Sequence, residues 1–540
     1  MSIALTGLAL LATAFAGWRA WRRLRYFLHL FQLEGYKPRE YGGWIGTHRH
    51  VVLRRSHLAG LALLALGAAA TAFRWPAWIW LLVMAGWPVA FASSRLYRST
   101  QPKKPLAYTA RMKRLLTTAV ILTAVPAAVG AMLGLERGAP SGWLPYLAGL
   151  WLADLGAPLW VLLAGYLMRP VEARIQAGFK RQARRTLARR PDLTVIGITG
   201  SYGKTSTKFI IAEILRQRYS VLASPGSYNT PMGLCLVINT MLKPEHQILV
   251  LEYGIRYRGD IQELTAIAAP DVAVVTTVGV AHLETMGSIE NIALEKGDLV
   301  RYARPGATVV LNVDNPHVAA MAGEATGRVW RVALEAEADI TARDIRYGPD
   351  GASFLVRDDT GTEHRFTTRL LGRHNILNIL LGVAVGRAFG LRLRQIAHAV
   401  ARVQPVEHRL QLRREGAITI IDDAFNSNPV GARNAVEILG HFDTGRRVIV
   451  TPGMVELGAR QAEENRILGT HIARHADLAV LVGPEQTRPI REGLIEAGFP
   501  EDRIRTVGSL FEAQEVLQTY LRPGDVVLYE NDLPDQYDES

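Results

Sequence analysis

The sequence is short of cysteine, and its first third is short of acidic residues. Cys235 is the single cysteine among 540 residues, which excludes an intrachain disulfide and fits a reducing compartment. A lone cysteine can serve as a nucleophile, but Cys235 lies in the apolar run 234–237. We therefore expect it to be a buried packing residue.

The shortage of acidic residues is confined to one end of the chain. Residues 1–190 contain 26 Lys and Arg but only 5 Asp and Glu. The remaining residues contain 36 Lys and Arg and 44 Asp and Glu. The net charge of +13 therefore combines +21 in the first third with −8 in the rest. Because the basic excess stays in the N-terminal third, the charge argues against a nucleic-acid-binding surface on the remainder, and no nucleic-acid partner is expected.

Five apolar segments occupy residues 1–170. They lie at about 3–17, 58–73, 76–92, 115–135 and 143–168. A bilayer span takes about 20 apolar residues, with a range of about 17–25, so the last two are long enough and the first three are short. No positive charge precedes the first segment, which argues against a cleaved signal peptide. We predict an α-helical membrane domain of about five spans.

The connections between these segments predict an orientation. Lysine and arginine crowd the connections after the first, third and fifth segments, whereas the other two hold Arg74 and the pair Glu136 and Arg137. Positive charge marks the cytoplasmic side. We therefore expect a multi-pass protein of the cell membrane, with its N-terminus outside and residues 170–540 in the cytoplasm. Asp154 falls within the fifth segment, where an acid is either a functional group or a buried polar contact, and the sequence leaves both open.

Residues 199–208 read T-G-S-Y-G-K-T-S-T-K. They lie between the apolar run 193–198, which predicts a buried strand, and 209–215, which predicts a helix. Such a glycine-rich turn offers backbone N–H groups to a polyphosphate, with Lys204 near the terminal phosphates and the Thr205 hydroxyl near Mg²⁺. The first glycine of a common P-loop is replaced by Ile198, and Gly200 makes the loop more compact. The sequence predicts an ATP-using protein.

Short apolar runs then alternate with helical patterns, which predicts parallel sheets with helices on both faces. The runs lie at 248–251, 272–276, 308–311, 418–421, 448–450 and 478–482. Ligands of such sheets lie beyond the carboxyl ends of the strands. Glu252 directly follows the first run and could complete Mg²⁺ coordination beside Thr205. His282 follows the second run, and Lys296 lies in the helical pattern after it.

Taken together, the motifs resemble the Mur ligases, which are ATP-dependent amide-forming enzymes of cell-wall synthesis, and within them the D-alanyl-D-alanine-adding branch. The resemblance covers about residues 192–540. Besides 199–208, its motifs are N-T-P-M-G at 229–233, E-Y-G at 252–254, A-H-L-E at 281–284 with Lys296, N-V-D at 312–314, G-R-H-N at 372–375 with Asn378, H-R-L at 408–410, D-D-A-F-N-S-N-P at 422–429 and E-L-G at 456–458.

The resemblance implies roles for individual residues. Nucleotide-binding candidates are Thr199, Gly200, Ser201, Tyr202, Gly203, Lys204, Thr205 and Ser206 at the phosphates, His374, Asn375 and Asn378 near the base, and Arg409 and Asp422 closing from the last domain. Metal-ligand candidates are Thr205 and Glu252 for one Mg²⁺, and His282 for a second, with Lys296 in the position where family members can carry a carbamylated lysine. Substrate candidates are Asn229, Thr230, Asn426, Asn428 and Glu456. Catalytic candidates are Lys204, His282, Lys296 and Arg409.

The predicted fold is α/β, with the membrane domain at 1–170 followed by a basic linker helix at 171–191. A central P-loop Mur ligase domain at 192–410 and a C-terminal Rossmann-like domain at 411–540 come next. The implied function is that of a membrane-anchored acid–amino-acid ligase that uses ATP and Mg²⁺ and forms an acyl phosphate. It would join D-alanyl-D-alanine, or a similar amino acid or dipeptide, to a muramoyl-peptide precursor, with membrane lipid as a further partner.

Departures from the branch leave alternatives open. Tyr202 stands where the branch usually has Asn, Phe425 replaces a usual Tyr, and Pro452 with Gly453 replaces a common Gly-Asp pair. Membrane segments also occupy the place of the soluble domain that holds the uridine end of the substrate, so the acid is either lipid-linked or held in another way. The alternatives are a same-fold ligase of poly-γ-glutamate or folylpolyglutamate type, an ATP-driven transporter, and an inactive scaffold.

Overall fold

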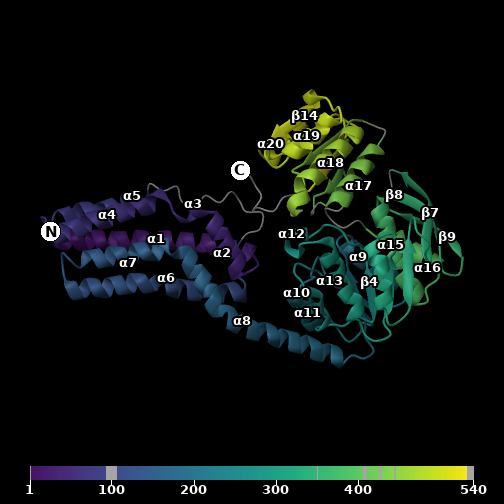
Figure 1. Cartoon of the computed structure of the whole chain (residues 1–540), viewed down its shortest axis with the longest axis horizontal. Helices are drawn as coiled ribbons and strands as arrows, with labels where there is room; N and C mark the ends of the chain where they lie inside the picture. Colours follow the sequence, from purple (N-terminus) through teal and green to yellow (C-terminus); the bar gives the residue numbers. More distant parts are fainter. Residues whose placement is uncertain are drawn as a thin grey trace. The chain divides into compact units, whose positions relative to one another are not determined.

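The computed structural model describes two compact units, residues 1–176 and 177–540 (Figure 1). The described residues are 2–92, 106–348, 351–404, 410–424, 428–442, 445–455 and 457–531. The first unit is helical, and the second contains two β-sheets with their covering helices. Three of the candidate site residues, Arg409, Asn426 and Glu456, lie outside the described residues, as do residues 532–540.

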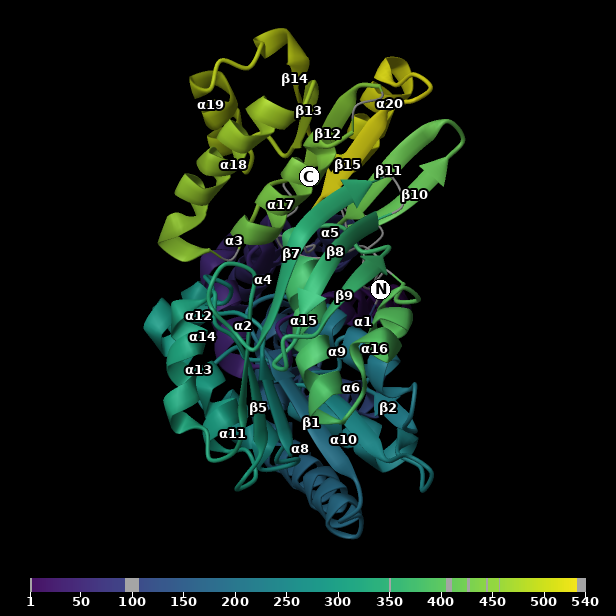
Figure 2. The same ribbon diagram turned by 90° about the vertical axis from the view of Figure 1, so that its right-hand side faces the viewer.

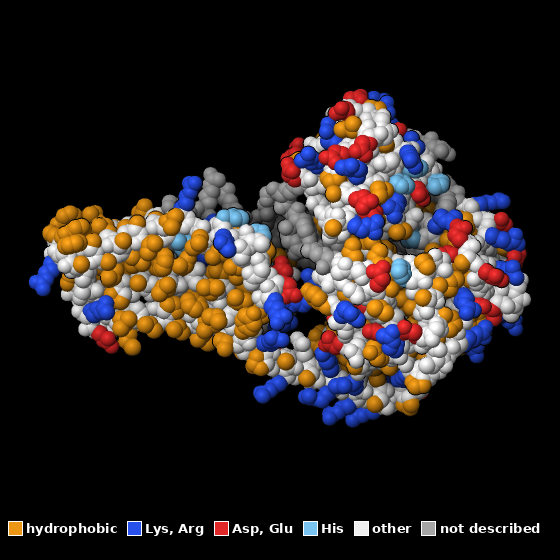
Figure 3. All heavy atoms as spheres, in the orientation of Figure 1, with side chains coloured by type: hydrophobic (Ala, Val, Ile, Leu, Met, Phe, Trp, Pro, Cys, Tyr) orange, Lys and Arg blue, Asp and Glu red, His pale blue; other side chains and the backbone are white. Residues whose placement is uncertain are grey.

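The helical unit consists of α1 to α7 and the first part of α8. Their bounds are Ser2–Leu33, Pro38–Thr47, Arg49–Val52, Arg55–Ala72, Ile79–Ala92, Ala110–Arg137, Trp143–Leu155 and Ala157–Ala188. The long helices α1, α4, α5, α6 and α7 pack side by side around two apolar cores. Figure 3 shows apolar side chains over much of the visible face of this unit.

Fewer than five membrane spans meet the criteria of length and composition. Within the described residues, α4 and α6 are long and apolar enough to cross a membrane, and α7 with α8 would count as a third span. The prediction of five spans is therefore not confirmed. Helix α5 is too short at 14 residues, and α1 carries four arginines along its 32 residues. The segment expected at 143–168 is not one straight helix, because α7 and α8 meet at an angle of 67°.

Asp154 is a buried polar contact within the helical unit. Its Oδ2 accepts hydrogen bonds from Arg19 Nε at 2.9 Å and His57 Nε2 at 3.0 Å, and Arg23 Nε lies 3.6 Å from Oδ1. Arg19 also donates to Ser56 Oγ at 2.7 Å. All these side chains are buried, and a buried charge is tolerated when it is paired and hydrogen-bonded. The contact joins α1, α4 and α7.

The second unit contains a nine-stranded sheet with the order β2-β3-β1-β4-β5-β6-β7-β8-β9. The strands β1 to β9 are Thr194–Thr199, Val221–Ala223, Ile248–Glu252, Val272–Val275, Thr308–Asn312, Val329–Ala333, Ile340–Gly348, Gly351–Arg357 and Glu363–Thr368. Neighbouring strands are parallel from β2 to β7, whereas β8 and β9 are antiparallel additions, visible side by side in Figure 2.

Helices cover both faces of this sheet, as the alternation of patterns predicts. Helices α9, α15 and α16 form one core with alternate strand residues, and α10, α11 and α13 contribute to the other. The helices are α9 Lys204–Leu215, α10 Pro231–Leu236, α11 Asp260–Thr265, α12 Leu283–Met286, α13 Ile289–Arg301, α14 Pro316–Ala319, α15 Arg373–Ala388 and α16 Leu393–Val400. Cys235 is buried in the second core, and burial raises the pKa of its thiol, which confirms a packing role.

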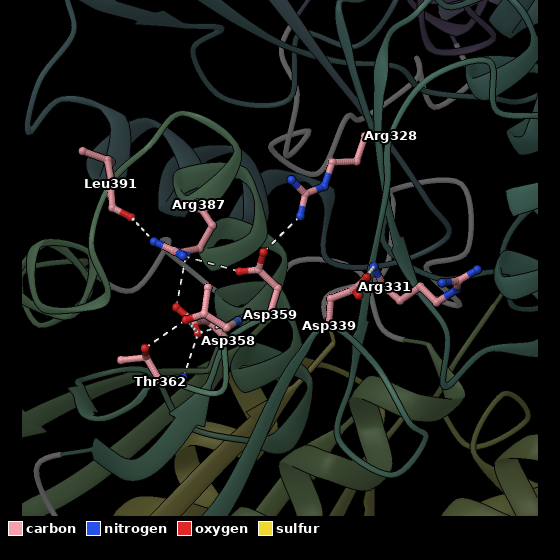
Figure 4. Close-up of polar contacts among 9 residues, drawn as sticks. Arg328, Arg331, Asp339, Asp358, Asp359, Thr362, Arg387 and Leu391 are labelled. Carbon is pink, nitrogen blue, oxygen red and sulfur yellow. Dashed lines mark hydrogen bonds and ion pairs between the residues drawn. The ribbon is translucent and has the colours of Figure 1, made fainter.

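The β8–β9 hairpin is tied to α15 by a polar cluster. Asp358 in the turn is 4% exposed, and its Oδ1 accepts from the backbone N–H groups of Thr360 and Thr362, each at 3.0 Å. Arg387 of α15 places its Nε 3.1 Å from Asp358 Oδ2, and Figure 4 shows its guanidinium directed at this turn. Arg328 reaches the adjacent Asp359 at 3.0 Å. The hairpin is therefore fixed by charge-assisted bonds as well as by its own ladder.

The last part of the chain forms a six-stranded sheet with the order β10-β11-β15-β12-β13-β14. Strands β10 to β15 are Gln411–Glu415, Ile418–Asp423, Arg447–Thr451, Leu478–Val482, Ile504–Val507 and Val526–Glu530. All are parallel except β10. Helices α17 Pro429–Gly440, α18 Gln461–His475, α19 Arg488–Glu496 and α20 Leu510–Tyr520 cover it. The seven strands expected from the sequence and the helix expected after the P-loop are all present in the unit, with each strand end within two residues of its expected position.

Candidate active site

The site begins at the loop between β1 and α9. Gly203, the residue before α9, has φ 80°, and a Cβ there would lie 2.5 Å from Asn378 Oδ1. Gly200 has φ 151°, and its Cβ would lie 1.8 Å from Thr276 Oγ1. Both positions therefore require glycine, because a side chain would be strained and would clash. The loop therefore packs closely against Thr276, which directly follows β4, and against Asn378 of α15.

The loop is held by its neighbours through backbone and hydroxyl groups. Ser201 donates its N–H to the Thr277 carbonyl at 2.7 Å, and its hydroxyl exchanges hydrogen bonds with the Gly279 backbone at 2.9 and 3.1 Å. Thr276 Oγ1 donates to the Tyr202 carbonyl at 2.5 Å. Lys204 Nζ donates to the Gly200 carbonyl at 2.6 Å. The ammonium group therefore lies at the loop where a polyphosphate would bind.

Thr205 and Glu252 meet at the end of β3. Thr205 Oγ1 donates to Glu252 Oε2 at 3.1 Å, as expected for two groups that could share one cation. Glu252 Oε1 lies 2.7 Å from Lys208 Nζ, and neither side chain has exposed surface. Lys208 also donates to the Gly226 carbonyl at 2.5 Å. Glu252 is therefore held in place by a buried lysine one turn after Lys204.

His282 and Lys296 form a second group beyond β4. His282 has φ 66°, an uncommon conformation for a residue other than glycine, and precedes α12. Burial and the nearby charges of Lys204, Lys296 and Arg256 lower the pKa of His282 to about 4, so its imidazole is neutral at pH 7. Lys296 is 1% exposed, and its pKa is lowered well below the usual value by burial and by Lys204. A neutral imidazole can bind a metal, and a neutral amine can react with CO₂.

Asn378, Asn375 and His374 lie at the start of α15, beside the loop. Asn378 Oδ1 accepts from Thr207 Oγ1 at 3.1 Å, and Asn378 Nδ2 donates to Asn375 Oδ1 at 3.3 Å. The ring of His374 lies 3.3 Å from the Asn434 amide of α17. These contacts link the first sheet's α15 to a helix of the second sheet at the site.

A cavity of about 580 Å³ is lined by many of these residues, among them Lys204, Thr205, Glu252, His282 and Asn378. Asn428 and Arg433, from the last part of the chain, also line this cavity. Asn428 caps α17 by accepting a hydrogen bond from Gly431 N at 2.8 Å. Arg433 pairs with the buried Glu464 at 3.3 Å, and Arg460 pairs with the same carboxylate at 2.6 Å. The cavity is thus lined from both sheets of the unit, with cations on both sides.

Most of the predicted site residues line this cavity. Those that do are Ser201, Tyr202, Gly203, Lys204, Thr205, Ser206, Asn229, Glu252, His282, His374, Asn375, Asn378 and Asn428. Five others lie outside its lining: Thr199, Gly200, Thr230, Lys296 and Asp422. Thr230 instead caps α10 by accepting from Gly233 N at 3.2 Å.

Asp422 lies outside the cavity lining. It forms an ion pair with Arg413 of β10 at 3.1 Å, whereas the next residue, Asp423, lines the cavity. Successive residues of a strand face opposite sides of a sheet, so the two acids of a D-D pair lie on opposite faces. The sequence marks the pair but does not say which member faces the cavity.

Sequence reasoning also missed Lys208, Arg433, Arg460 and Glu464. Lys208 could have been found, because it lies four residues after Lys204 and so on the same face of α9. The other three come from helices whose position depends on how the second sheet packs, and no local pattern marks them.

The donor set fits Mg²⁺ at Thr205 and Glu252. A hydroxyl and a carboxylate are the oxygen ligands that Mg²⁺ accepts, and the ion usually completes its shell with substrate phosphates and water. In the part of the chain that the structure describes, no group of three or more His, Cys, Asp and Glu could hold a metal. Thr205 and Glu252 would supply part of the coordination shell of one ion, and substrate phosphates and water the rest.

Comparisons with known proteins identify the family of the second unit. The Mur ligase middle domain matches residues 198–386, and the Mur ligase glutamate ligase domain matches residues 408–529. UDP-N-acetylmuramoyl-tripeptide--D-alanyl-D-alanine ligase of Mycobacterium tuberculosis (strain ATCC 25618 / H37Rv) is 34% identical over 441 residues, covering 76% of this chain and 81% of its own. The ligase of the same name from Bacillus subtilis (strain 168) is 27% identical over 338 residues, covering 62% and 72%.

Solved structures show the same similarity. The MurF ligase from Thermotoga maritima in complex with ADP superposes with a TM-score of 0.60 at 28% identity, covering 66% of this chain and 80% of that one. MurF from Acinetobacter baumannii gives a TM-score of 0.61 at 24% identity, covering 67% and 78%, which supports the fold alone. Both family matches lie after residue 176, within the second unit.

Proposed function

Because this chain belongs to the Mur ligase family and is an ATP-dependent ligase that forms amide bonds, we propose that it adds D-alanyl-D-alanine to a muramoyl-tripeptide precursor. The curated relatives reported above carry this activity in their names. The observation that carries the proposal is the cavity that unites the P-loop, Glu252, His282 and Asn428. It gives a phosphate-binding loop and a second wall from the C-terminal sheet, as a two-substrate ligase requires.

The reaction would proceed through an acyl phosphate. A carboxylate oxygen of the acid attacks the γ-phosphorus of ATP, and ADP leaves. The amine of D-alanyl-D-alanine then attacks the acyl carbon, loses a proton, and phosphate leaves with the amide formed. Lys204 at the loop would offset charge on the transferring phosphoryl group. The acyl phosphate hydrolyses readily, so the walls of the cavity must keep water away from it.

Thr205 and Glu252 would hold one Mg²⁺, and His282 a second with Lys296 as a carbamylated ligand. When bound, the ions would offset the negative charge of the phosphates. The low pKa of Lys296 supports carbamylation, because only the neutral amine adds CO₂. The role of Lys208 is to hold the Glu252 carboxylate in place beside Thr205.

The helical unit would anchor the enzyme in the cell membrane. We propose that the N-terminus lies outside and the ligase unit in the cytoplasm, where ATP is available. The apolar helices α4 and α6 support a membrane location, and the arginine-rich connections support this orientation. The acid substrate would then be either nucleotide-linked or carried by a membrane lipid.

Phosphate release by the full chain in detergent tests the proposal. ATP and Mg²⁺ would be supplied with UDP-linked or lipid-linked muramoyl tripeptide, each with and without D-alanyl-D-alanine, and Lys204→Ala would serve as the blank. Release that needs both acid and amine is expected, and the preferred acid identifies the carrier. ATP turnover indifferent to both substrates would reject the cell-wall assignment and favour a ligase of another polymer.

A further inference from the structure

We propose that a cavity at one end of the helical unit binds the phosphate-bearing head group of an anionic membrane lipid. The inference rests on the proposed membrane location of this unit. The cavity has a volume of about 420 Å³ and lies between the end of α1, the start of α2, the start of α6 and the middle of α8. It is separate from the ligase site, which lies in the other unit.

The lining of this cavity is basic. It holds four cationic side chains, Lys37, Arg39, Arg111 and Arg169, against two acidic ones, Glu40 and Glu172. The acids are already engaged: Glu172 accepts from Arg114 at 2.7 Å, and Glu40 lies 3.7 Å from Lys37. Within the described residues, Arg39 and Arg169 form no ion pair and are exposed. Two positive charges are therefore left for an anion.

One of the cations is held in place. The guanidinium of Arg111 lies over the ring of Tyr36, 4.2 Å from its centroid, and 3.9 Å from Glu172. Tyr36 in turn accepts a hydrogen bond at its hydroxyl from Gln32 Nε2, at 2.7 Å. A guanidinium positioned in this way binds phosphate with little loss of side-chain entropy, and its planar donors match phosphate oxygens.

An apolar stripe on α8 leads to the same cavity. Leu159, Leu163, Tyr166, Leu167 and Val171 are exposed by 37–55%. Their spacing of three and four residues places them along one side of the helix. Tyr166 also lines the cavity, so the stripe and the cationic lining meet there.

The combination fits an amphiphile better than a soluble anion. The cations would contact the phosphate, and the stripe would contact the lipid's acyl chain. A soluble phosphate would contact the cations but not the apolar surface of Tyr166, which lines the same cavity. Basic cavities between helices on the cytoplasmic side of a membrane are suited to anionic lipid head groups.

Lipid binding to the delipidated full chain in detergent tests this site. We would titrate phosphatidylglycerol and phosphatidylcholine separately and count bound lipid by native mass spectrometry. One phosphatidylglycerol should bind at least tenfold more tightly than phosphatidylcholine. The Arg39→Gln and Arg169→Gln variants should each weaken phosphatidylglycerol about fivefold, as expected for removing one cation near a membrane surface. Arg174→Gln removes an exposed arginine of α8 outside the cavity and should leave binding unchanged.

Three results would overturn the proposal. They are equal binding of the two lipids, cavity variants that bind as the unaltered chain does, and displacement of the lipid by inorganic pyrophosphate at equal concentration, which would indicate a site for soluble anions. Ligase activity with the UDP-linked acid would be measured on the same samples. Loss of lipid binding with activity intact concerns this site, whereas absent activity with lipid binding intact concerns the ligase assignment alone.

Discussion

Glu252 would serve both the fold, through a buried ion pair, and the reaction, as a proposed metal ligand. Its carboxylate contacts Thr205 at 3.1 Å and the buried Lys208 at 2.7 Å. Removing one partner of a buried ion pair leaves the other charge uncompensated, which is more costly than removing both. The structural and catalytic parts of its role can therefore be separated by mutation.

Glu252→Gln should lower the free energy of unfolding by about 3 kcal/mol or more, because Lys208 loses its carboxylate partner. The double variant Lys208→Met with Glu252→Gln should recover most of this loss, yet remain inactive, because the proposed metal ligand is gone. Thermal unfolding and amide formation would be measured on both. A double variant that is active would contradict the metal role, and a single variant as stable as the unaltered chain would contradict the ion pair.

His282 predicts a pH dependence of stability. Its pKa is about 4 in the folded chain, against 6.5 for an ordinary histidine, so the unfolded chain binds a proton between these values and the folded chain does not. Stability should therefore fall as the pH is lowered from 6.5 to 4, by up to about 3 kcal/mol from this residue. His282→Asn should reduce that fall, as measured by unfolding at pH 7 and at pH 4.5. An equal fall in both proteins would show that His282 does not titrate in this way.

The sequence identified site residues best where a strand end places them. Glu252 directly follows a run predicted to be a buried strand, and the Gly-Lys-Thr turn lies between a strand and a helix. Both therefore lie at the carboxyl ends of parallel strands, and this placement does not depend on how the rest of the chain packs. Glu464 and Arg433 could not be predicted, because their place at the cavity depends on packing between two sheets. The sequence also does not say which acid of the D-D pair lines the cavity, because Asp422 and Asp423 face opposite sides of their strand.

At the scale of elements, one buried acid organises the turn of the β8–β9 hairpin. Asp358 is 4% exposed, accepts two backbone hydrogen bonds and pairs with Arg387 (Figure 4). The hairpin lies at the edge of the nine-stranded sheet, where no further strand supports it among the described residues. Its turn and its link to α15 therefore matter for the stability of this edge.

Asp358→Ala should lower the free energy of unfolding by about 3 kcal/mol, because two backbone N–H groups of the turn and the Arg387 guanidinium lose their acceptor. Asp359→Ala is the matched control, since that neighbouring acid is more exposed and should cost about 1 kcal/mol or less. Thermal unfolding of the two variants checks the difference. Equal losses would show that the hairpin is not held by Asp358.

Strands β1, β3, β4 and β5 of the central sheet could be predicted because they are buried parallel strands with continuous apolar runs. Strands β2 and β6 were not predicted, because β2 has only three residues and Arg331 interrupts the apolar run of β6. The antiparallel strands β8 and β9 could not be predicted either, because their residues alternate between buried and exposed and form no such run. The bend between α7 and α8 was also missed. Gly156 stands there in an otherwise apolar stretch, and composition alone does not distinguish a bent pair from one span.

At the scale of the whole molecule, the proposed topology can be tested through the single cysteine. Cys235 is 2% exposed, so it should give little background in labelling. Ser141→Cys, in the connection between α6 and α7, should react with a membrane-impermeant maleimide on intact cells. Gly46→Cys, in α2, should react only after lysis, because that connection is proposed to be cytoplasmic. The reverse pattern would contradict the orientation, and labelling of both on intact cells would contradict a membrane-spanning arrangement.

The two units also differ in how far sequence alone defines them. The ligase unit carries motifs whose order and spacing match a family over most of its length. The helical unit offers only hydropathy and charge, which predict apolar helices but not their number of crossings. Its buried Arg19–Asp154 contact joins residues 135 positions apart, and no local pattern predicts such a pair.

The mass of the product tests the central claim most directly. The purified full chain would be incubated with ATP, Mg²⁺, D-alanyl-D-alanine and a muramoyl tripeptide whose terminal carboxylate carries heavy oxygen. The account predicts a product equal to the acid plus the dipeptide less one water, with one heavy oxygen transferred to the released phosphate. Amide without label in the phosphate would contradict the acyl phosphate, and ATP hydrolysis without any such amide would contradict the proposed activity.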